Sequence, residues 1–318
     1  MSGPQGDTPA MPFDSIFRPG LFAGLTHVVT GAGSGIGRCT AHELASLGAT
    51  VALVGRKPDK LERVRDEIAA AGGTAHAIAC DIREEAQVQA MVGAVLEQTG
   101  RIDGLVNNAG GQFASPLASI TGKGWETVVR TNLTGGFLCA RECYTRWMCE
   151  HAGAIVNIVA DMWGSMPGMG HSGAARAGMV SFTETAAVEW AVSGVRVNAV
   201  APGWIASSGL DTYPEWMHRF LRLLALAVPL QRLGTESEVS AAICFLLSPA
   251  AAFVSGIVLR VDGAAPNAKL ASPLSAVAAD AERAAAEGRQ PWPLAPHDRS
   301  RPWNGFHLAE TPRVFRDR

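Results

Sequence analysis

The sequence predicts an α/β fold: one Rossmann-type, doubly wound parallel sheet of about seven strands, followed by a C-terminal extension. From residue 25 to residue 263, strand-like apolar runs alternate with helix-like segments, which is the pattern of a parallel sheet with right-handed crossovers. The run at 154–159 is nearly continuous in apolar residues, as expected for a strand buried on both faces. A glycine-rich turn also follows the first apolar run, where such folds hold a phosphate.

The individual elements follow from this alternation in order. We expect strands at 25–30, 50–54, 75–80, 102–107, 154–159, 195–200 and 257–262. We expect helices in the intervals, at 35–47, 59–71, 85–98, 124–149, 174–193 and 237–247. The first helix is closed by Gly48, because glycine readily adopts the backbone that ends a helix.

Three regions are expected: an N-terminal arm at 1–20, a dinucleotide-binding and catalytic domain at 21–265, and an extension at 266–318. Within the domain, residues 203–232 interrupt the alternation after a strand's carboxyl end, where open α/β sheets bind ligands. A substrate lid and an ordinary core helix both fit this segment. The extension carries Trp292, Trp303 and Phe306. Disordered tails are usually poor in aromatic residues, so we expect it to pack on a protein surface.

Composition excludes several classes of function. The net charge is −2, which gives no electrostatic basis for binding nucleic acid or an anionic membrane. No apolar run approaches the roughly 20 residues of a membrane span, and we see no secretory signal. The six cysteines form no CxxC pair and have no histidine spaced to complete a metal site. We therefore expect a cytoplasmic protein with reduced thiols and no metal.

The turn at 30–38 is the strongest functional motif. An apolar strand precedes it and a helix follows it, so backbone N–H groups and the helix N-terminus can approach a pyrophosphate. A glycine-rich structural turn without a ligand is the alternative. The residues expected to contact the cofactor here are Gly31, Ser34, Gly35, Ile36 and Gly37.

Basic residues at the end of the second strand indicate which dinucleotide binds. Arg56 and Lys57 stand where a carboxylate would bind a ribose 2′-hydroxyl and repel a 2′-phosphate. Arg38, at the start of the first helix, adds a positive charge, and guanidinium–phosphate contacts are charge-assisted. The sequence favours NADP(H) over NAD(H); solvated surface arginines are the alternative.

Two further strand ends extend the expected cofactor site. A short carboxylate at the third strand end could bond the adenine amino group, and small residues at the fourth could let backbone lie beside the adenosine ribose. The residues concerned are Asp81, Ile82, Asn108, Ala109 and Gly110.

Taken in order, these motifs resemble those of the short-chain dehydrogenases/reductases over about residues 20–265. The glycine turn, Asp81-Ile82, Asn107–Gly110, Asn132 and Pro202-Gly203 carry the resemblance. It implies a nicotinamide dinucleotide, a homotetramer, and a Pro-Gly-x-Ile segment beside the nicotinamide. That segment supplies Pro202, Gly203 and Ile205.

The catalytic pair of that family is missing. Members carry Tyr-x-x-x-Lys, but Ser172 holds the tyrosine place and Arg176 the lysine place here, and the family's serine falls on Ala160 or its neighbours. Neither tyrosine of the chain, Tyr144 or Tyr213, fits by spacing. An unassisted serine is a poor general acid near neutrality.

The segments 107–113 and 171–178 are similar to those of the peroxisomal trans-2-enoyl-CoA reductases, which share the serine and the arginine. The resemblance implies NADPH-dependent reduction of an apolar acyl-CoA, in which an enolate oxygen needs hydrogen-bond donors more than a proton relay. The catalytic candidates are Asn132, Ser172, Arg176 and His171, although His171 also fits a packing role. Arg176, in the lysine place, is also expected to bind the ribose hydroxyls of the cofactor. Similarity to dehydrogenases of acyclic terpenoid alcohols leaves a second activity open, and a catalytically degenerate cofactor-binding subunit is the third alternative.

Overall fold

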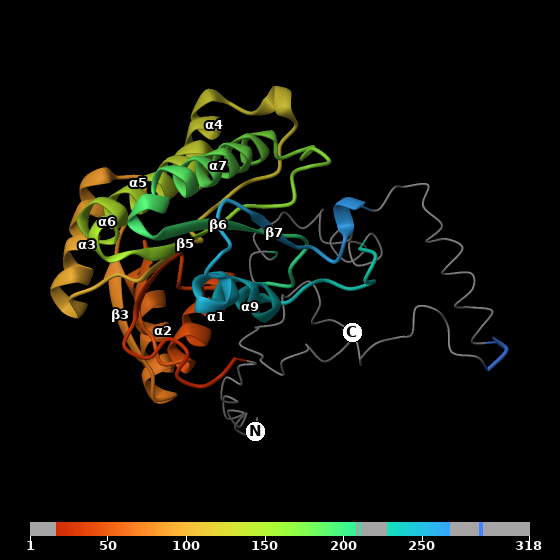
Figure 1. Cartoon of the computed structure of the whole chain (residues 1–318). Helices are drawn as coiled ribbons and strands as arrows, with labels where there is room; N and C mark the ends of the chain where they lie inside the picture. The colour runs from red at the N-terminus through yellow and green to blue at the C-terminus, as the bar shows by residue number, and fades with distance from the viewer. Residues whose placement is uncertain (1–16, 208–209, 211–227, 268–285, 289–318) are drawn as a thin grey trace, which may run out of the picture.

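The chain forms a seven-stranded, entirely parallel sheet with strand order β3-β2-β1-β4-β5-β6-β7 (Figure 1). The computed structural model describes residues 17–207, 210, 228–267 and 286–288. The strands are β1 Thr26–Thr30, β2 Thr50–Gly55, β3 Thr74–Ala79, β4 Gly104–Asn107, β5 Gly153–Ile158, β6 Val195–Pro202 and β7 Val258–Val261. The predicted fold class is confirmed, and the predicted strands are confirmed to within about two residues at their ends.

The order of the strands reverses between β1 and β4, which makes this pair the topological switch point of the sheet. β1 pairs with β2 on one side and with β4 on the other, in registers that set Val28 beside Ala52 and Leu105. Loops from β1 and β4 leave in opposite directions at such a point, and the gap between them at the strands' carboxyl ends is where open α/β sheets bind ligands.

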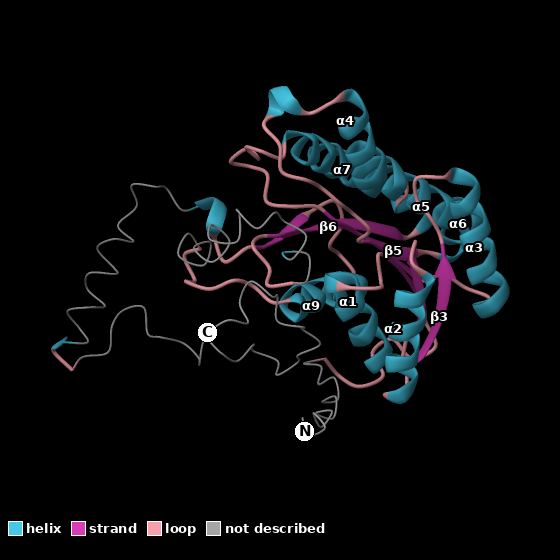
Figure 2. Cartoon of the chain, turned by 180° about the vertical axis from the view of Figure 1, so that it is seen from behind, coloured by secondary structure: helices cyan, strands magenta, loops and turns pink. Residues whose placement is uncertain are grey.

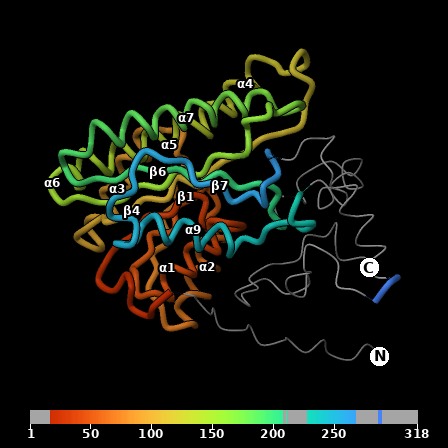
Figure 3. The backbone as a smooth tube through the Cα atoms, turned by 45° about the vertical axis from the view of Figure 1, so that its right-hand side comes forward, coloured from red at the N-terminus to blue at the C-terminus, as the bar shows by residue number. Residues whose placement is uncertain are grey.

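Helices cover both faces of the sheet (Figure 2). On one face, α1 (Gly35–Ser46), α2 (Pro58–Ala70) and α9 (Glu236–Leu247) bury residues such as Leu44, Val64 and Ile243 against it. On the other face lie α3 (Glu85–Thr99), α5 (Gly135–Cys143) and α7 (Gly170–Glu189). The tube in Figure 3 shows α4 (Gly122–Val129) beside α7 on that second face.

The helix predicted at 124–149 is not one regular α-helix. It runs as α4, a π-helical turn at Arg130–Thr134, α5, a second π turn at Tyr144–Met148, and α6 (Cys149–His151). A π turn inserts one residue into the helical repeat and so rotates the side chains that follow. Two glycines then let α5 approach its neighbours: a Cβ on Gly135 would lie 2.7 Å from the Ile82 side chain, and one on Gly136 2.6 Å from Met179.

The predicted helix at 174–193 begins earlier and ends earlier. α7 starts at Gly170, and after Glu189 a 3-10 turn at Ala191–Ser193 leads to Gly194 with φ 71°. Most of the predicted N-terminal arm, the helix within the lid segment and most of the C-terminal extension fall outside the described residues. Within the described segments, no helix combines the length and apolarity that crossing a bilayer requires.

Candidate active site

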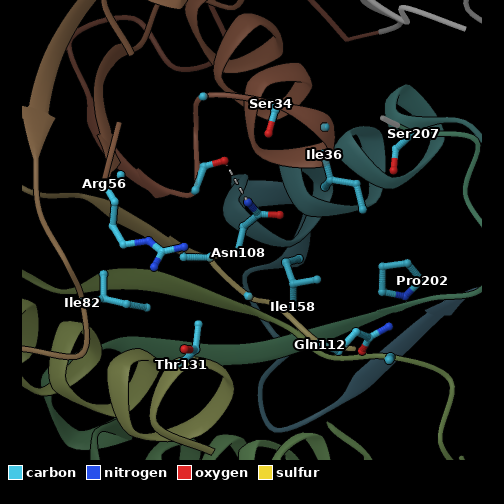
Figure 4. A pocket seen from close by; sticks show the side chains of 18 of the residues that line it. Ser34, Ile36, Arg56, Ile82, Asn108, Gln112, Thr131, Ile158, Pro202 and Ser207 are labelled. Atoms are coloured by element: carbon cyan, nitrogen blue, oxygen red, sulfur yellow. Dashed lines mark hydrogen bonds between the residues drawn. The ribbon is translucent and has the colours of Figure 1, made fainter. Parts of the chain in front are cut away.

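A cleft of about 700 Å³ opens at the carboxyl ends of the strands. Figure 4 shows Arg56 and Ile82 at one end of it and Gln112 and Pro202 at the other, with Asn108 between them. Most of the predicted cofactor residues line this cleft: Gly31, Ser34, Gly35, Ile36, Arg56, Asp81, Ile82, Asn108, Ala109, Gly110, Arg176, Pro202, Gly203 and Ile205. Five predicted residues, Gly37, Arg38, Asn132, His171 and Ser172, are not among its lining.

The glycine turn is packed tightly against the end of β4. Gly31 has φ 67°, and a Cβ there would lie 2.9 Å from the Ala109 Cα atom. A Cβ on Gly37 would come within 2.4 Å of the Gly31 carbonyl oxygen and of the Asn108 amide. Only glycine allows this backbone and this approach. Gly37 therefore supports the turn by packing against its backbone and does not itself line the cleft.

Hydrogen bonds from Thr30 hold the two strand ends together. Its buried hydroxyl donates to the Val106 carbonyl and accepts from the backbone N–H groups of Asn108 and Ala109. In return, the Asn108 Nδ2 group donates to the Thr30 carbonyl at 2.8 Å, and the same amide reaches the Gly31 carbonyl at 3.4 Å (Figure 4). This network fixes the turn before any ligand binds.

The end of the cleft beside β2 is basic. Arg56, Lys57, Lys60 and Arg83 line it, and the carboxylate among them is Asp81. Asp81 is paired with Arg83, whose hydrogen bonds lower the pKa of the Asp81 carboxyl. Its oxygens are therefore engaged by a cation, and the suggested bond to an adenine amino group stays a prediction.

Arg176 is buried at the floor of the cleft. Its Nη1 group donates to the Ile158 carbonyl, and no described group bonds its Nε atom. Burial lowers the pKa of the guanidinium to about 10, so the group remains charged at neutral pH. A Cβ on Gly110 would lie 2.5 Å from its Nη2 atom, which places this cation directly under the loop after β4.

A chain of polar groups connects Asn132 to the cleft. The π turn directs Asn132 inward, where its Oδ1 accepts from the Gly111 N–H at 2.9 Å and its Nδ2 donates to the Gly111 carbonyl at 3.0 Å. These two bonds define which end of the amide is the donor, and that donor is 3.5 Å from the Ser172 hydroxyl. Ser172 in turn donates to the Gln112 Oε1 atom at 2.7 Å. The serine proton is thus directed at Gln112, which lines the cleft.

Two further positions of the predicted site are His171 and the place of the family serine. His171 is fully buried; its ring packs edge-on against Phe113 with centroids 4.4 Å apart. This arrangement matches the packing alternative and leaves a catalytic role for His171 a prediction. At the position of the family serine, Ala160 lines the cleft. The next residue, Asp161, has a carboxyl pKa raised by burial and by the nearby Asp262.

The residues present fit a dinucleotide. A glycine turn lies beside the end of β4, a basic group of side chains lies at one end of the cleft, and a buried guanidinium whose Nε atom has no partner among the described residues lies under the loop after β4. Sequence reasoning missed Gln112, Lys60 and Arg83. A signal for Lys60 existed, since it lies one helical turn beyond Lys57; Gln112 lies in a loop without periodicity.

Comparison with known proteins is consistent with this geometry. Residues 31–264 match the family model described as enoyl-(acyl carrier protein) reductase. The chain is 36% identical over 239 residues to a probable 2,4-dienoyl-CoA reductase of Bacillus subtilis, a match that covers 74% of this chain and 94% of that protein. It is 35% identical over 257 residues to the peroxisomal 2,4-dienoyl-CoA reductase of Danio rerio, covering 80% and 85%.

Solved structures give similar results. A citronellol catabolism dehydrogenase of Pseudomonas aeruginosa PAO1 is 62% identical with a TM-score of 0.72, covering 80% of this chain and 99% of that one. A putative NAD(P)-dependent gluconate 5-dehydrogenase of Beutenbergia cavernae, solved with bound NADP, is 34% identical with a TM-score of 0.73, covering 79% and 100%.

Proposed function

The chain belongs to the short-chain dehydrogenase/reductase family, and from this premise we propose that it uses NADP(H) to reduce a carbon–carbon double bond conjugated to a thioester carbonyl. The observation that carries the proposal is the bond from Ser172 to Gln112. The group at the usual tyrosine place is a serine whose proton is already directed at an amide of the cleft wall. An alcohol–ketone reaction needs a proton relay at that place.

Gln112 supplies what reduction of a conjugated thioester needs. When a hydride adds to the β-carbon, negative charge develops on the thioester oxygen, and preorganised donors stabilise that charge. The Gln112 amide carries two N–H donors, and the Ser172 hydroxyl, by donating to its oxygen, polarises it further. We assign Gln112 as the donor to the substrate oxygen, Ser172 and Asn132 as the residues that orient it, and solvent as the source of the α-carbon proton.

Arg176 completes the site without taking part in proton transfer. The guanidinium stays charged at neutral pH although burial lowers its pKa, so it can bind ribose hydroxyls as a cation; we assign it no proton transfer, because arginine is the side chain least able to give up its proton. The bound nicotinamide would supply the hydride. Arg176 then orients the dinucleotide from beneath the loop after β4, and Pro202, Gly203 and Ile205 line the same cleft at its other end.

Dinucleotide preference rests on the basic end of the cleft. Arg56, Lys57 and Lys60 surround the place after β2 where a carboxylate would exclude a 2′-phosphate. This supports NADP(H) over NAD(H). The curated relatives named above are dienoyl-CoA reductases; an acyl-CoA substrate for this chain, whether enoyl or dienoyl, is our proposal.

A second function, oxidation of an acyclic terpenoid alcohol, is supported by the 62% identity to a citronellol catabolism dehydrogenase. Purified protein should be assayed by NADPH absorbance with enoyl- and dienoyl-CoA thioesters, and with NADP⁺ and citronellol. We expect oxidation of NADPH by the thioesters. Turnover of citronellol alone would favour the second function. Binding of NADPH without either turnover would favour a catalytically degenerate subunit.

The variant Gln112→Leu tests the assigned donor. It keeps the side-chain volume but removes the amide, and turnover of the thioester should fall about ten- to a hundredfold while NADPH affinity changes little. Gln89→Leu, an exposed glutamine on α3, is the matched control and should retain the parent rate. A parent rate in Gln112→Leu contradicts the assignment.

A further inference from the structure

Arg38, the arginine that the sequence places nearest the glycine turn, is held by another helix. Its Nε atom donates to the Glu67 Oε2 atom of α2 at 2.8 Å, and the His42 Nε2 atom lies 3.1 Å from the same oxygen. Burial by itself raises the pKa of this carboxyl, but the hydrogen bonds from His42 and Arg38 outweigh it and lower the pKa to about 2. Arg38 therefore lies in an ion pair between α1 and α2, and it is not part of the cleft lining.

The first turn of α2 is fixed beside the glycine turn by close packing. Leu61 is buried, and its Cδ2 atom lies 3.3 Å from where a Cβ on Gly55 would be and 3.7 Å from where one on Gly33 would be. The Lys60 Cβ atom lies 3.0 Å from that same point on Gly33. The stem of Lys60 thus lies against the glycine turn, and the buried Leu61 side chain sets its position relative to the end of β2.

The positive charges at the β2 end of the cleft outnumber the carboxylates among them. Arg56, Lys57 and Lys60 are exposed, line the cleft, and make no ion pair within the part of the chain that the structure describes. Arg83 differs, because Asp81 neutralises it. Asp81 also interacts electrostatically with Arg56, but one carboxylate cannot neutralise four cations. Such an excess of positive charge around one strand end is the chemistry that recognises a phosphomonoester dianion.

We propose that Lys60, together with Arg56, binds the adenosine 2′-phosphate of NADP(H), and that Arg38 instead holds α2 against α1 through Glu67. This inference rests on the proposed preference for NADP(H). The inference differs from the sequence-based prediction in two roles. Arg38 of α1 is a structural residue, and Lys60 of α2 determines the preference between the two dinucleotides.

The test measures dissociation constants of NADPH and NADH by the fluorescence of the bound nicotinamide, so it does not depend on turnover. Lys60→Gln should weaken NADPH binding about five- to thirtyfold and leave NADH within twofold, the range between an exposed ion pair and a charge-assisted hydrogen bond. Arg38→Gln should change the NADPH-to-NADH affinity ratio less than about twofold but lower the melting temperature, because Glu67 loses a partner.

Arg65→Gln is the matched control for net charge. Arg65 lies on the same helix, pairs with Glu62 and Asp66, and does not line the cleft; its removal should leave the ratio unchanged. A parent protein that binds NADH as tightly as NADPH overturns the cofactor proposal and this inference with it. If the parent prefers NADPH, an affinity ratio that is unchanged in Lys60→Gln, or one that falls more than about fivefold in Arg38→Gln, overturns the inference alone.

Discussion

Protonation of His27 should limit the stability of this protein at mildly acidic pH. His27 lies on the central strand β1 and is 2% exposed. Its ring packs edge-on against Phe22, and a Cβ on the facing Gly104 would lie 2.3 Å from its Cδ2 atom. Burial lowers its pKa from 6.5 to about 4, and the nearby Asp103 raises the pKa only in part. The folded protein therefore holds this ring neutral.

The sign and size of the effect follow from the two pKa values. Between pH 6.5 and 4 the unfolded chain binds a proton on His27 that the folded chain does not, so the free energy of unfolding falls as pH falls through this window. The complete difference is worth about 3 kcal/mol, of which about 2 kcal/mol is lost between pH 7.5 and pH 5. Glu67, with its pKa lowered to about 2, adds a separate loss only below pH 4.5.

Urea unfolding of the full chain at several pH values between 5 and 7.5 measures this slope. His27→Asn removes the titrating group; it lowers stability at every pH because the site is packed, but it should flatten the slope. His151→Asn, an exposed position, is the control and should keep the parent slope. A parent stability that is constant from pH 7.5 to 5, or an unchanged slope in His27→Asn, would refute the reasoning.

Three further predictions concern the site and the assembly. Ser172→Ala should lower thioester reduction about ten- to a hundredfold, because Gln112 loses the hydroxyl that orients it, whereas Ser181→Ala on the exposed side of α7 should not; a parent rate in Ser172→Ala would place the donor elsewhere. Arg176→Ala should weaken NADPH binding as well as turnover. The family resemblance also leads us to expect a homotetramer with symmetric interfaces, as most oligomers have; a monomer in sedimentation at micromolar concentration would contradict this expectation.

The sheet and the cofactor cleft were predictable because their signals are local. Each buried strand is a short apolar run. The turn after β1 is identified by glycines that no larger residue could replace. The structure gives the reason at Gly31 and Gly37, where an added Cβ would meet backbone or amide atoms within 2.9 Å. The position of Arg56 could be predicted for the same reason, because this residue comes directly after the last residue of β2.

The features that the sequence did not predict depend on contacts between distant segments. The π turn at Arg130–Thr134 leaves no mark on hydrophobic spacing, although it directs Asn132 toward Gly111. Glu67 lies 29 positions from Arg38, so nothing local shows that the two are paired. Gln112 lies in an irregular loop and meets Ser172 only because β4 and α7 converge at the cleft.

The contact between Ser172 and Gln112 also bears on how this site could change over time. Ser172 has no exposed surface, and its hydroxyl oxygen is 2.7 Å from the Gln112 side chain. A phenol ring introduced by Ser172→Tyr has no space unless Gln112 moves or shrinks, and overpacking of this kind is costly. Installing the family's Tyr-x-x-x-Lys pair would therefore require replacements at 172 and 176 together with a change at 112. The tyrosine introduced alone would be overpacked against Gln112, so the packing at this contact opposes the change.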